Sequence, residues 1–207
     1  MPKTPSSRRW LQEHRADPFV QRARAAGYRS RAAFKLMDLD RRYGLLRPGA
    51  VVLDLGAAPG GWCQWAGERV GPKGRVVAVD VLPMVRIEGV EFIQGDFREG
   101  AVRASVMAAL GGARADLVLS DMAPNLSGIA VMDQARAMHL AELALDLAVA
   151  CLARGGSFLV KVFQGEGLDG YLRALRTRFA AVERRKPEAS RARSRELYVL
   201  ARGYAGI

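Results

Sequence analysis

The stretch LDLGAAPGGW, residues 53–62, decides the fold that this sequence predicts. It completes a short apolar run that suits a buried strand, and Gly56, Gly60 and Gly61 then let the backbone turn sharply and approach a ligand closely. A helix is expected directly behind this loop, with its N-terminal amide groups facing the same ligand. The spacing G-x-x-x-G-G differs from the G-x-G-x-x-G of dinucleotide-binding folds. For a glycine loop alone, the alternative is a tight strand-to-helix turn without a ligand.

Strand and helix patterns alternate along the rest of the chain. Short apolar runs predict strands at 51–55, 75–80, 90–94, 115–120, 157–163 and 196–202, and helices are expected at 60–70, 131–153 and 168–179. Upstream, Ser30 is expected to cap a helix over 31–43. This alternation predicts an α/β fold, a Rossmann-like and mostly parallel sheet with helices on both faces. Such sheets bind ligands at the carboxyl ends of their strands.

The chain is strongly basic, and its charge is unevenly placed. Of its 207 residues 50% are hydrophobic, and the formal net charge of +11 favours a polyanionic partner. Residues 1–47 hold twelve Lys or Arg against four Asp or Glu, and a second basic cluster lies near the C-terminus: Arg184, Arg185, Lys186, Arg191, Arg193 and Arg195. A solvated helix face is the alternative for one run of charge, but two clusters around a near-neutral middle favour nucleic acid. We expect a single domain over 1–207, with a basic helical extension at 1–47 and an α/β core at 48–207.

The rarer residue types indicate the compartment. Cys63 and Cys151 are the only cysteines and stand in unrelated contexts, so a disulfide framework is not expected and a reducing compartment fits. His14 and His139 are isolated, without the spacing of a zinc site. No apolar run is long enough for a membrane span, and no signal-peptide core is present. We therefore expect a cytoplasmic protein, a monomer by default, without a metal or a membrane partner.

Acidic residues follow the second and third expected strands. Asp80 comes twenty-four residues after Gly56, where a carboxylate is placed to accept hydrogen bonds from ribose hydroxyls. Asp96, in QGDF (94–97), is suited to an exocyclic amine. Together these acids predict an adenosine-bearing ligand with no pyrophosphate requirement. Asp54, inside the first strand, is expected to hold the glycine loop or to lie near the amino-acid end of the ligand.

A lysine interrupts the apolar run of the fifth expected strand. In GGSFLVKVFQG (155–165) Lys161 stands among apolar neighbours, where an ammonium is expensive to bury unless it is paired or loses its proton. Asp121 ends the preceding strand in LSDMAPN (119–125), so the two side chains are expected to meet at adjacent strand ends facing one cleft. The alternatives are a purely structural ion pair and a lysine whose stem reaches solvent.

Seven motifs, in order and without large insertions, resemble those of the FtsJ/RrmJ-type ribosomal RNA methyltransferases over nearly the whole chain: SRAAFKL (30–36), LDLGAAPGGW (53–62), VVAVD (76–80), QGDF (94–97), LSDMAPN (119–125), FLVKVFQG (158–165) and SRELYVLA (194–201). The resemblance implies the seven-stranded fold of methyltransferases that use S-adenosylmethionine. It also implies methyl transfer to a ribose 2′-hydroxyl, of a uridine, in large-subunit ribosomal RNA of the 23S type. By resemblance, the catalytic tetrad is Lys35, Asp121, Lys161 and Glu196, and the cofactor contacts are Gly60, Trp62, Asp80, Asp96 and Asp121.

The resemblance gives Lys161 a chemical task but leaves its form open. A ribose hydroxyl is a poor nucleophile at neutral pH, so a base or a nearby cation must help as its proton leaves. Desolvation and the charge of Lys35 favour a neutral, basic Lys161, whereas Asp121 and Glu196 favour the ammonium. Both roles need a lysine at a strand end.

Other functions fit the sequence less well. A methyltransferase acting on bases is expected to carry an Asn/Asp-Pro-Pro-aromatic loop after the fourth strand, and Asp-Met-Ala-Pro-Asn stands there instead. A protein methyltransferase leaves the second lysine without a task, and the glycine spacing argues against an NAD-dependent enzyme. A cap-type or tRNA-type 2′-O-methyltransferase, or an RNA-binding assembly factor without activity, remain the alternatives.

Overall fold

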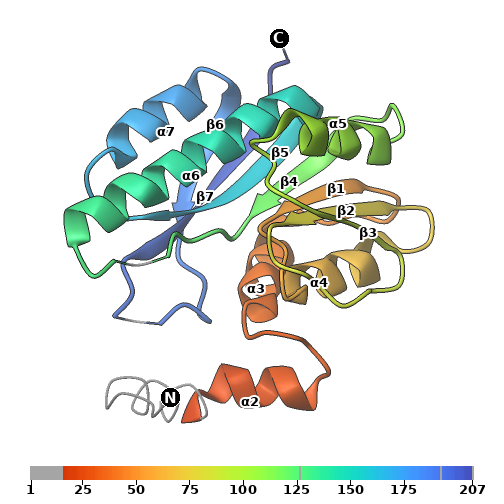
Figure 1. Cartoon of the computed structure of the whole chain (residues 1–207), viewed down its shortest axis with the longest axis horizontal. Helices are drawn as coiled ribbons and strands as arrows, with labels where there is room; N and C mark the ends of the chain where they lie inside the picture. Colours follow the sequence, from red (N-terminus) through yellow and green to blue (C-terminus); the bar gives the residue numbers. More distant parts are fainter. Residues whose placement is uncertain (1–15, 126, 192, 207) are drawn as a thin grey trace.

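A seven-stranded sheet runs through the centre of the computed structural model, which describes residues 16–125, 127–191 and 193–206 (Figure 1). The strand order is β3-β2-β1-β4-β5-β7-β6. Neighbours from β3 to β5 pair in parallel, whereas β7 pairs antiparallel with both β5 and β6. The strands are β1 (Val51–Leu55), β2 (Arg75–Asp80), β3 (Val90–Gln94), β4 (Ala115–Ser120), β5 (Leu152–Phe163), β6 (Phe179–Arg185) and β7 (Glu196–Tyr204). The predicted mostly parallel sheet is confirmed.

Helices cover both faces of this sheet (Figure 1). One face packs against α5, α6 and α7, and the other against α3 and α4. The helices are α2 (Pro18–Ala25), α3 (Ala33–Tyr43), α4 (Gly61–Val70), α5 (Gly100–Ala109), α6 (Ala130–Cys151) and α7 (Leu168–Arg176). Among these helices, none is long and apolar enough to cross a membrane.

Alternating side chains divide the core between the two faces. In β1, Leu53 and Leu55 pack in the layer of α5 to α7, whereas Val52 packs in the layer of α3 and α4. This period of two follows from the pleat, which turns successive side chains to opposite faces. Both faces are covered by helices, so both sets are apolar, and the strands read as continuous hydrophobic runs in the sequence.

Two elements escaped the sequence prediction. The helix expected over 168–179 ends at Arg176, because Phe179 instead begins β6. Its ring is buried near Phe158 and Tyr204, with centroid distances of 6.5 and 5.4 Å. Tertiary packing thus overrides the helical pattern at this point. Helix α5 was missed because it buries only Val106 and Ala109, which leaves a weak periodic signal.

The start of α3 also differs from the prediction. Ala32, not Ser30, is the N-cap residue, and no side chain caps the helix. The Ser30 hydroxyl instead lies against Gly61, at a place that a Cβ of that residue would fill. Upstream, Asp17 caps α2 by accepting a hydrogen bond of 3.0 Å from the amide of Phe19, and Pro18 occupies a first-turn position where its missing N–H costs nothing.

The carboxylate of Asp40 ties α3 to α4. It is 3% exposed and accepts hydrogen bonds from the amide of Leu46 at 2.8 Å, the indole of Trp65 at 3.1 Å and the guanidinium of Arg69 at 3.2 Å. Three donors compensate the cost of burying this charge. These hydrogen bonds fix the position of α3 against the sheet, and therefore that of Lys35, which α3 carries.

We predict that Asp40→Ala lowers the free energy of unfolding by about 2–4 kcal/mol, because it leaves buried donors without an acceptor. Denaturant unfolding followed by circular dichroism measures the change. Asp38→Ala is the control, since Asp38 pairs with a half-exposed Arg42 at 2.7 Å and its removal is expected to cost less than about 1 kcal/mol. Equal destabilisation of the two variants would contradict the role given to Asp40.

Candidate active site

A cavity of about 490 Å³ lies at the carboxyl ends of β1, β2, β3 and β4. Asp80, Asp96 and Asp121 all contribute to its wall, so the fold brings together the acids that the sequence singled out. The rest of the wall is mostly apolar or backbone: Gly56, Ala58, Val79, Val81, Leu82, Gly95, Phe97, Met122, Ala123 and Leu140, with Arg98 and Asn125. Few, convergent polar groups on an apolar wall are typical of a small-molecule site.

Asp80 is oriented by the backbone around it. One carboxylate oxygen accepts the amide of Ala58 and the other the amide of Leu82, both at 2.8 Å. Each oxygen of an ionised carboxylate can accept a second hydrogen bond. Asp80 can therefore accept two further donors from the cavity without giving up its own support.

Asp96 is held ionised by a neighbouring arginine. The guanidinium of Arg98 donates to it at 2.8 Å, and the amide of the same residue donates at 2.9 Å. The side-chain hydrogen bond from Arg98 is the main cause that lowers the pKa of Asp96. The residue therefore offers a negatively charged acceptor near neutral pH.

The glycine loop passes close to the fourth strand. Gly56 has a φ of 76°, and a Cβ there would collide with the side chain of Met122. Neither the backbone angle nor the space admits a larger residue. This glycine lets the end of β1 approach the loop after β4 across the mouth of the cavity.

Two predicted cofactor contacts lie away from the larger cavity. Trp62 is 3% exposed and lines an adjoining cavity of about 60 Å³, together with Gly56 and Asp121. Its indole donates to the carbonyl of Ala32 at 2.8 Å. Gly60 contributes to the wall of neither cavity. It is the N-cap residue of α4 and has a φ of 107°.

Asp54 lies beneath the glycine loop. Its carboxylate accepts a hydrogen bond from the thiol of Cys63 at 3.1 Å. Burial raises the pKa of Asp54 to about 7, against the smaller lowering effect of that hydrogen bond. Asp54 also lines the 60 Å³ cavity beside residues of the glycine loop; whether it holds this loop or lies near the amino-acid end of the ligand stays a prediction.

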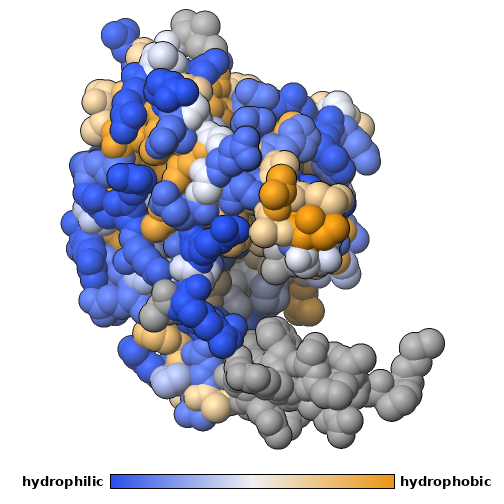
Figure 2. Space-filling view, turned by 90° about the vertical axis from the view of Figure 1, so that its left-hand side faces the viewer, coloured by the Kyte–Doolittle hydropathy of each residue, from blue (hydrophilic) through white to orange (hydrophobic). Residues whose placement is uncertain are grey.

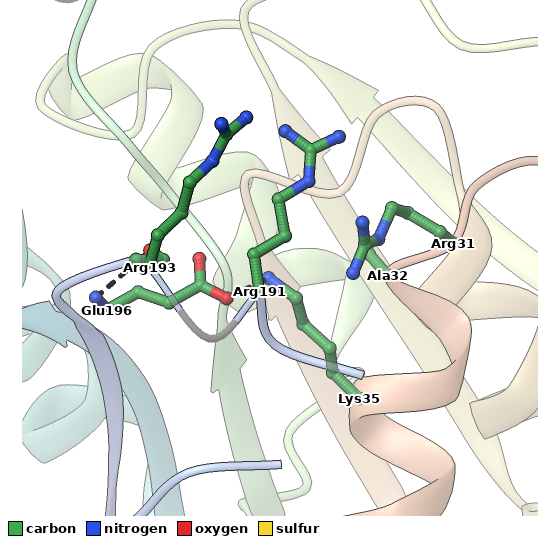
Figure 3. Close-up of a pocket in the computed structure, with 7 residues that line it drawn as sticks. Arg31, Ala32, Lys35, Arg191, Arg193 and Glu196 are labelled. Carbon is green, nitrogen blue, oxygen red and sulfur yellow. Dashed lines mark hydrogen bonds and ion pairs between the residues drawn. The ribbon is translucent and has the colours of Figure 1, made fainter. Parts of the chain in front are cut away.

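The four residues of the predicted tetrad form two ion pairs, one between β5 and the end of β4 and one between α3 and β7. Lys161 lies 3.0 Å from a carboxylate oxygen of Asp121 and donates to the backbone carbonyl of the same residue at 2.7 Å. Lys35 lies 2.8 Å from Glu196, and Figure 3 shows these two side chains pointing toward each other. All four side chains are at most 16% exposed.

Tyr198 joins the two pairs. Its hydroxyl donates to Asp121 at 2.6 Å and accepts from Lys35 at 3.2 Å. Tyr198 is directly opposite Lys161 in the β5–β7 register, and its ring lies 5.8 Å from that of Trp62. Trp62 therefore packs against the residue that joins the two pairs, and its predicted contact with the cofactor stays a prediction.

The sequence prediction missed Tyr198. A signal was available, because the tyrosine stands two residues after Glu196 in ELYVLAR and therefore faces the same side of the strand. A buried phenol needs a hydrogen-bond partner, and the acid of the same face was already assigned to the site.

The network sets the charges within it. Burial by itself raises the pKa of Asp121, but the charges of Lys161 and Lys35 and the hydrogen bond from Tyr198 outweigh burial, so the pKa lies below its usual value. Burial and the charge of Asp121 raise the pKa of Tyr198 well above 10, so the phenol keeps its proton. Asp121 is therefore a carboxylate and Tyr198 a neutral donor at neutral pH.

The sheet order, with its reversed last strand and the acid-lined cavity at the strand ends, defines a Rossmann-like methyltransferase that uses S-adenosylmethionine. The FtsJ-like methyltransferase family model matches residues 28–204. A protein from Alkalilimnicola ehrlichii named "Ribosomal RNA large subunit methyltransferase E" is 61% identical over 202 residues, which cover 98% of this chain and 97% of the relative. A protein of the same name from Azoarcus sp. is 59% identical over 97% of this chain and 98% of its own length.

The fold comparison agrees with the sequence comparison. A crystal structure of a protein from Plasmodium falciparum, described as a ribosomal RNA methyltransferase, superposes with a TM-score of 0.79 at 29% identity. It covers 87% of this chain and the whole of the other. The chain belongs to the FtsJ-like methyltransferase family. The resemblance is confirmed, and with it the predicted cofactor, S-adenosylmethionine.

The residues of the 490 Å³ cavity fit this cofactor. Asp80 offers acceptors for ribose hydroxyls, Asp96 an acceptor for an exocyclic amine, and the apolar wall a surface for a purine ring. When bound, S-adenosylmethionine supplies a methyl group on a positively charged sulfur. Asp121, which lines both cavities, brings a carboxylate of lowered pKa to the same region.

We predict that Asp80→Ala weakens S-adenosylmethionine binding by about 1.5–3 kcal/mol, because the ribose hydroxyls lose a charged acceptor. Calorimetric titration measures the affinity, and a melting curve controls for loosening of the Ala58 loop. Asp38→Ala is the control, because Asp38 lines neither the 490 Å³ nor the 60 Å³ cavity, and it is expected to bind the cofactor like the unchanged protein. Unchanged affinity in Asp80→Ala would remove Asp80 from the site.

Proposed function

We propose that this protein methylates a ribose 2′-hydroxyl, of a uridine, in large-subunit ribosomal RNA of the 23S type, with S-adenosylmethionine as donor. The observation that carries the proposal is the joined unit of Lys35, Glu196, Tyr198, Asp121 and Lys161 beside an acid-lined cavity. The names of the curated relatives support large-subunit ribosomal RNA as substrate. Action as a monomer without a metal ion, in the cytoplasm, stays a prediction.

For direct methyl transfer the protein mainly has to position the two reactants and stabilise the charge that develops on the ribose oxygen. The ribose oxygen forms a bond to the methyl carbon as the carbon–sulfur bond breaks, and the hydroxyl proton leaves. Groups that bind the oxygen more tightly as its proton leaves lower the barrier. The protein must therefore offer a cation or a base next to this oxygen and exclude competing water.

Lys161 is the group we assign to this task. Among the described residues its ammonium has two acceptors, both on Asp121, for its three N–H donors, so one donor is available to a substrate oxygen. The carboxylate of Asp121, whose pKa lies below its usual value, is 3.0 Å from this ammonium. This arrangement favours a role as a fixed cation on the reacting oxygen over a role as general base.

The remaining members hold Lys161 and Asp121 in place. Glu196 neutralises Lys35, whose ammonium donates to the Tyr198 hydroxyl, which in turn donates to Asp121. Each buried polar group of this unit thus has a partner, which removes the penalty of an isolated buried charge. We assign positioning roles to Glu196, Tyr198 and Lys35.

RNA is expected to bind along the basic segment between β6 and β7. This segment holds Lys186, Arg191, Arg193 and Arg195, and it lies on the mostly hydrophilic face of the molecule in Figure 2. Arg193 and Glu196 share one cavity wall, so the segment leads into the tetrad. The basic residues before Ala16 lie outside the described residues, and their contact with RNA is part of the proposal.

We predict that Lys161→Ala lowers the methyl-transfer rate by about 10²–10⁴-fold and leaves S-adenosylmethionine affinity nearly unchanged. Single-turnover transfer of labelled methyl to ribosomal RNA measures the rate, and mapping of the product separates ribose from base methylation. Lys161→Arg separates the two roles of the lysine, because arginine keeps its charge and accepts no proton. Much retained activity would favour the fixed cation, and a decrease equal to that of alanine in a folded variant would favour the base.

Lys73→Ala, in the exposed turn before β2, is the matched control and is expected to react like the unchanged protein. Near-normal turnover by Lys161→Ala would return Lys161 to a structural role. Methyl groups found on bases would instead refute the proposed ribose chemistry.

We predict that RNA binding weakens steeply with salt, and that deleting residues 1–27 flattens the slope of log K against log salt by about 0.7–0.9 for each phosphate that the deleted residues neutralise. The deleted stretch holds six of the Lys and Arg residues. Fluorescence anisotropy at several salt concentrations measures the slope. The deletion leaves α3 and the whole sheet in place, so the shortened chain is expected to fold; unchanged affinity and slope would remove residues 1–27 from the RNA site.

A further inference from the structure

A third cavity, of about 550 Å³, opens on the Lys35–Glu196 side of the tetrad (Figure 3). Its wall is formed by Arg31, Ala32, Lys35, Arg191, Arg193, Ser194 and Glu196. In Figure 3 the side chains of Arg191 and Arg193 extend in the same direction, beyond Lys35 and Glu196. The wall therefore holds three guanidinium groups and one ammonium but only one carboxylate.

Another carboxylate, from the N-cap of α2, reaches the guanidinium groups of this cavity. Asp17 forms ion pairs with both Arg31 and Arg191, the latter at 3.4 Å, and both arginines use the same carboxylate oxygen. The side chain of Asp17 is only 9% exposed. Its other oxygen caps α2. One acid at the start of this helix thus lies between two arginines of the cavity.

The two arginines need an anion between them. Burial and then the charge of Arg191 lower the pKa of Arg31, which shows that the two cations repel each other. The electrostatic cost of holding the two guanidinium groups close together falls when a negative group accepts hydrogen bonds from both. In the free protein Asp17 is that group, and Arg31 is further held by the carbonyl of Ala189.

The position of the pair suits a phosphodiester. Arg31 lies four residues before Lys35, and Arg191 lies five before Glu196, so each guanidinium is tied to a tetrad residue through a short stretch of chain. In RNA the 3′-phosphodiester is attached to the ribose carbon next to the one that bears the 2′-hydroxyl. A ribose placed at the tetrad therefore brings a phosphate close to its reacting oxygen. Guanidinium groups match the paired oxygens of a phosphate in geometry and charge.

We propose that Arg31 and Arg191 form a binding subsite for an RNA phosphodiester next to the target ribose, and that Asp17 fills this subsite until RNA displaces it. The inference rests on the proposed function and adds the residues that receive the backbone beside the reacting sugar. Asp17 belongs to the same chain and so competes at high effective concentration. Single small anions then compete poorly, whereas an RNA that also contacts the basic segment can replace the carboxylate.

The substitution Asp17→Asn tests the exchange. Asparagine caps helices as well as aspartate does and keeps the bond to the Phe19 amide, but it removes the competing charge. We expect Asp17→Asn to bind a fluorescent ribosomal RNA fragment about two- to fivefold more tightly, the range of one ion pair, with unchanged S-adenosylmethionine affinity. A point substitution is needed because deletion of α2 also removes cations.

Glu183→Gln is the matched control. Glu183 also pairs with two arginines, Arg185 and Arg202, but it lies outside the cavity wall. A general gain from the removal of negative charge would raise RNA affinity equally in both variants, and this outcome overturns the proposal. Weaker or unchanged binding by Asp17→Asn also overturns it, because it would make Asp17 a support for the arginines.

A second variant, Arg191→Gln, tests the subsite independently, in case Asp17→Asn perturbs the fold. Arg191→Gln is expected to weaken RNA binding and to flatten its salt slope by about 0.7, the share of one phosphate on a single strand. In this background Asp17→Asn should bring little further gain, whereas a full gain would place the competition elsewhere and overturn the assignment. The binding comparison needs no catalysis. A failure to methylate ribose would therefore refute the proposed function, whereas the RNA affinities of these variants would still test the subsite.

Discussion

The hydroxyl of Tyr198 is the group on which the active-site geometry depends. It bridges the two ion pairs of the tetrad, accepting from Lys35 and donating to Asp121. Burying two ammonium groups and two carboxylates separately would cost several kcal/mol for each ion, and the bridge lets all of them share partners. The antiparallel pairing of β5 and β7 makes this possible, since it places Tyr198 opposite Lys161. The reversed last strand therefore has a chemical consequence as well as a topological one.

The supports of this bridge come from the layer of α3 and α4. Trp62 packs beside the Tyr198 ring and donates to the carbonyl of Ala32, at the start of the helix that carries Lys35. Asp40, one turn from the end of the same helix, joins it to α4 through Trp65 and Arg69. The position of Lys35 is thus determined by contacts on both ends of α3. Such precision suits a site in which small displacements of a charge change the rate severely.

Residues with a strong local pattern were predictable from the sequence. The strands from β1 to β4 match the apolar runs, and the acids and the lysine at their ends meet as expected because parallel strands share one carboxyl edge. Strand β6 was not predictable, because the burial of Phe179 against Tyr204 depends on a strand far along the chain. Tyr198 and Asp17 act through contacts across 77 and 174 residues of sequence, to Asp121 and Arg191. The local pattern of apolar and polar residues does not indicate such distant pairs, which form only when the chain folds.

The distribution of charge separates binding from chemistry. The tetrad holds two lysines and two acids, so it is neutral as a unit and exerts little attraction on RNA. In the proposed function the attraction comes from the arginines around it, of which Arg191 lies closer to solvent: its side chain is 33% exposed, against 9% for Lys161. A neutral, buried reaction centre keeps its internal geometry when salt or RNA changes the field outside, because buried pairs are screened little. An excess of positive charge within the tetrad would bind phosphate there and hold it at the place that the ribose hydroxyl must occupy. In the proposed function, the neutrality of the tetrad therefore favours ribose over phosphate at the reaction centre, and the proposed task of the surrounding arginines is to hold the backbone.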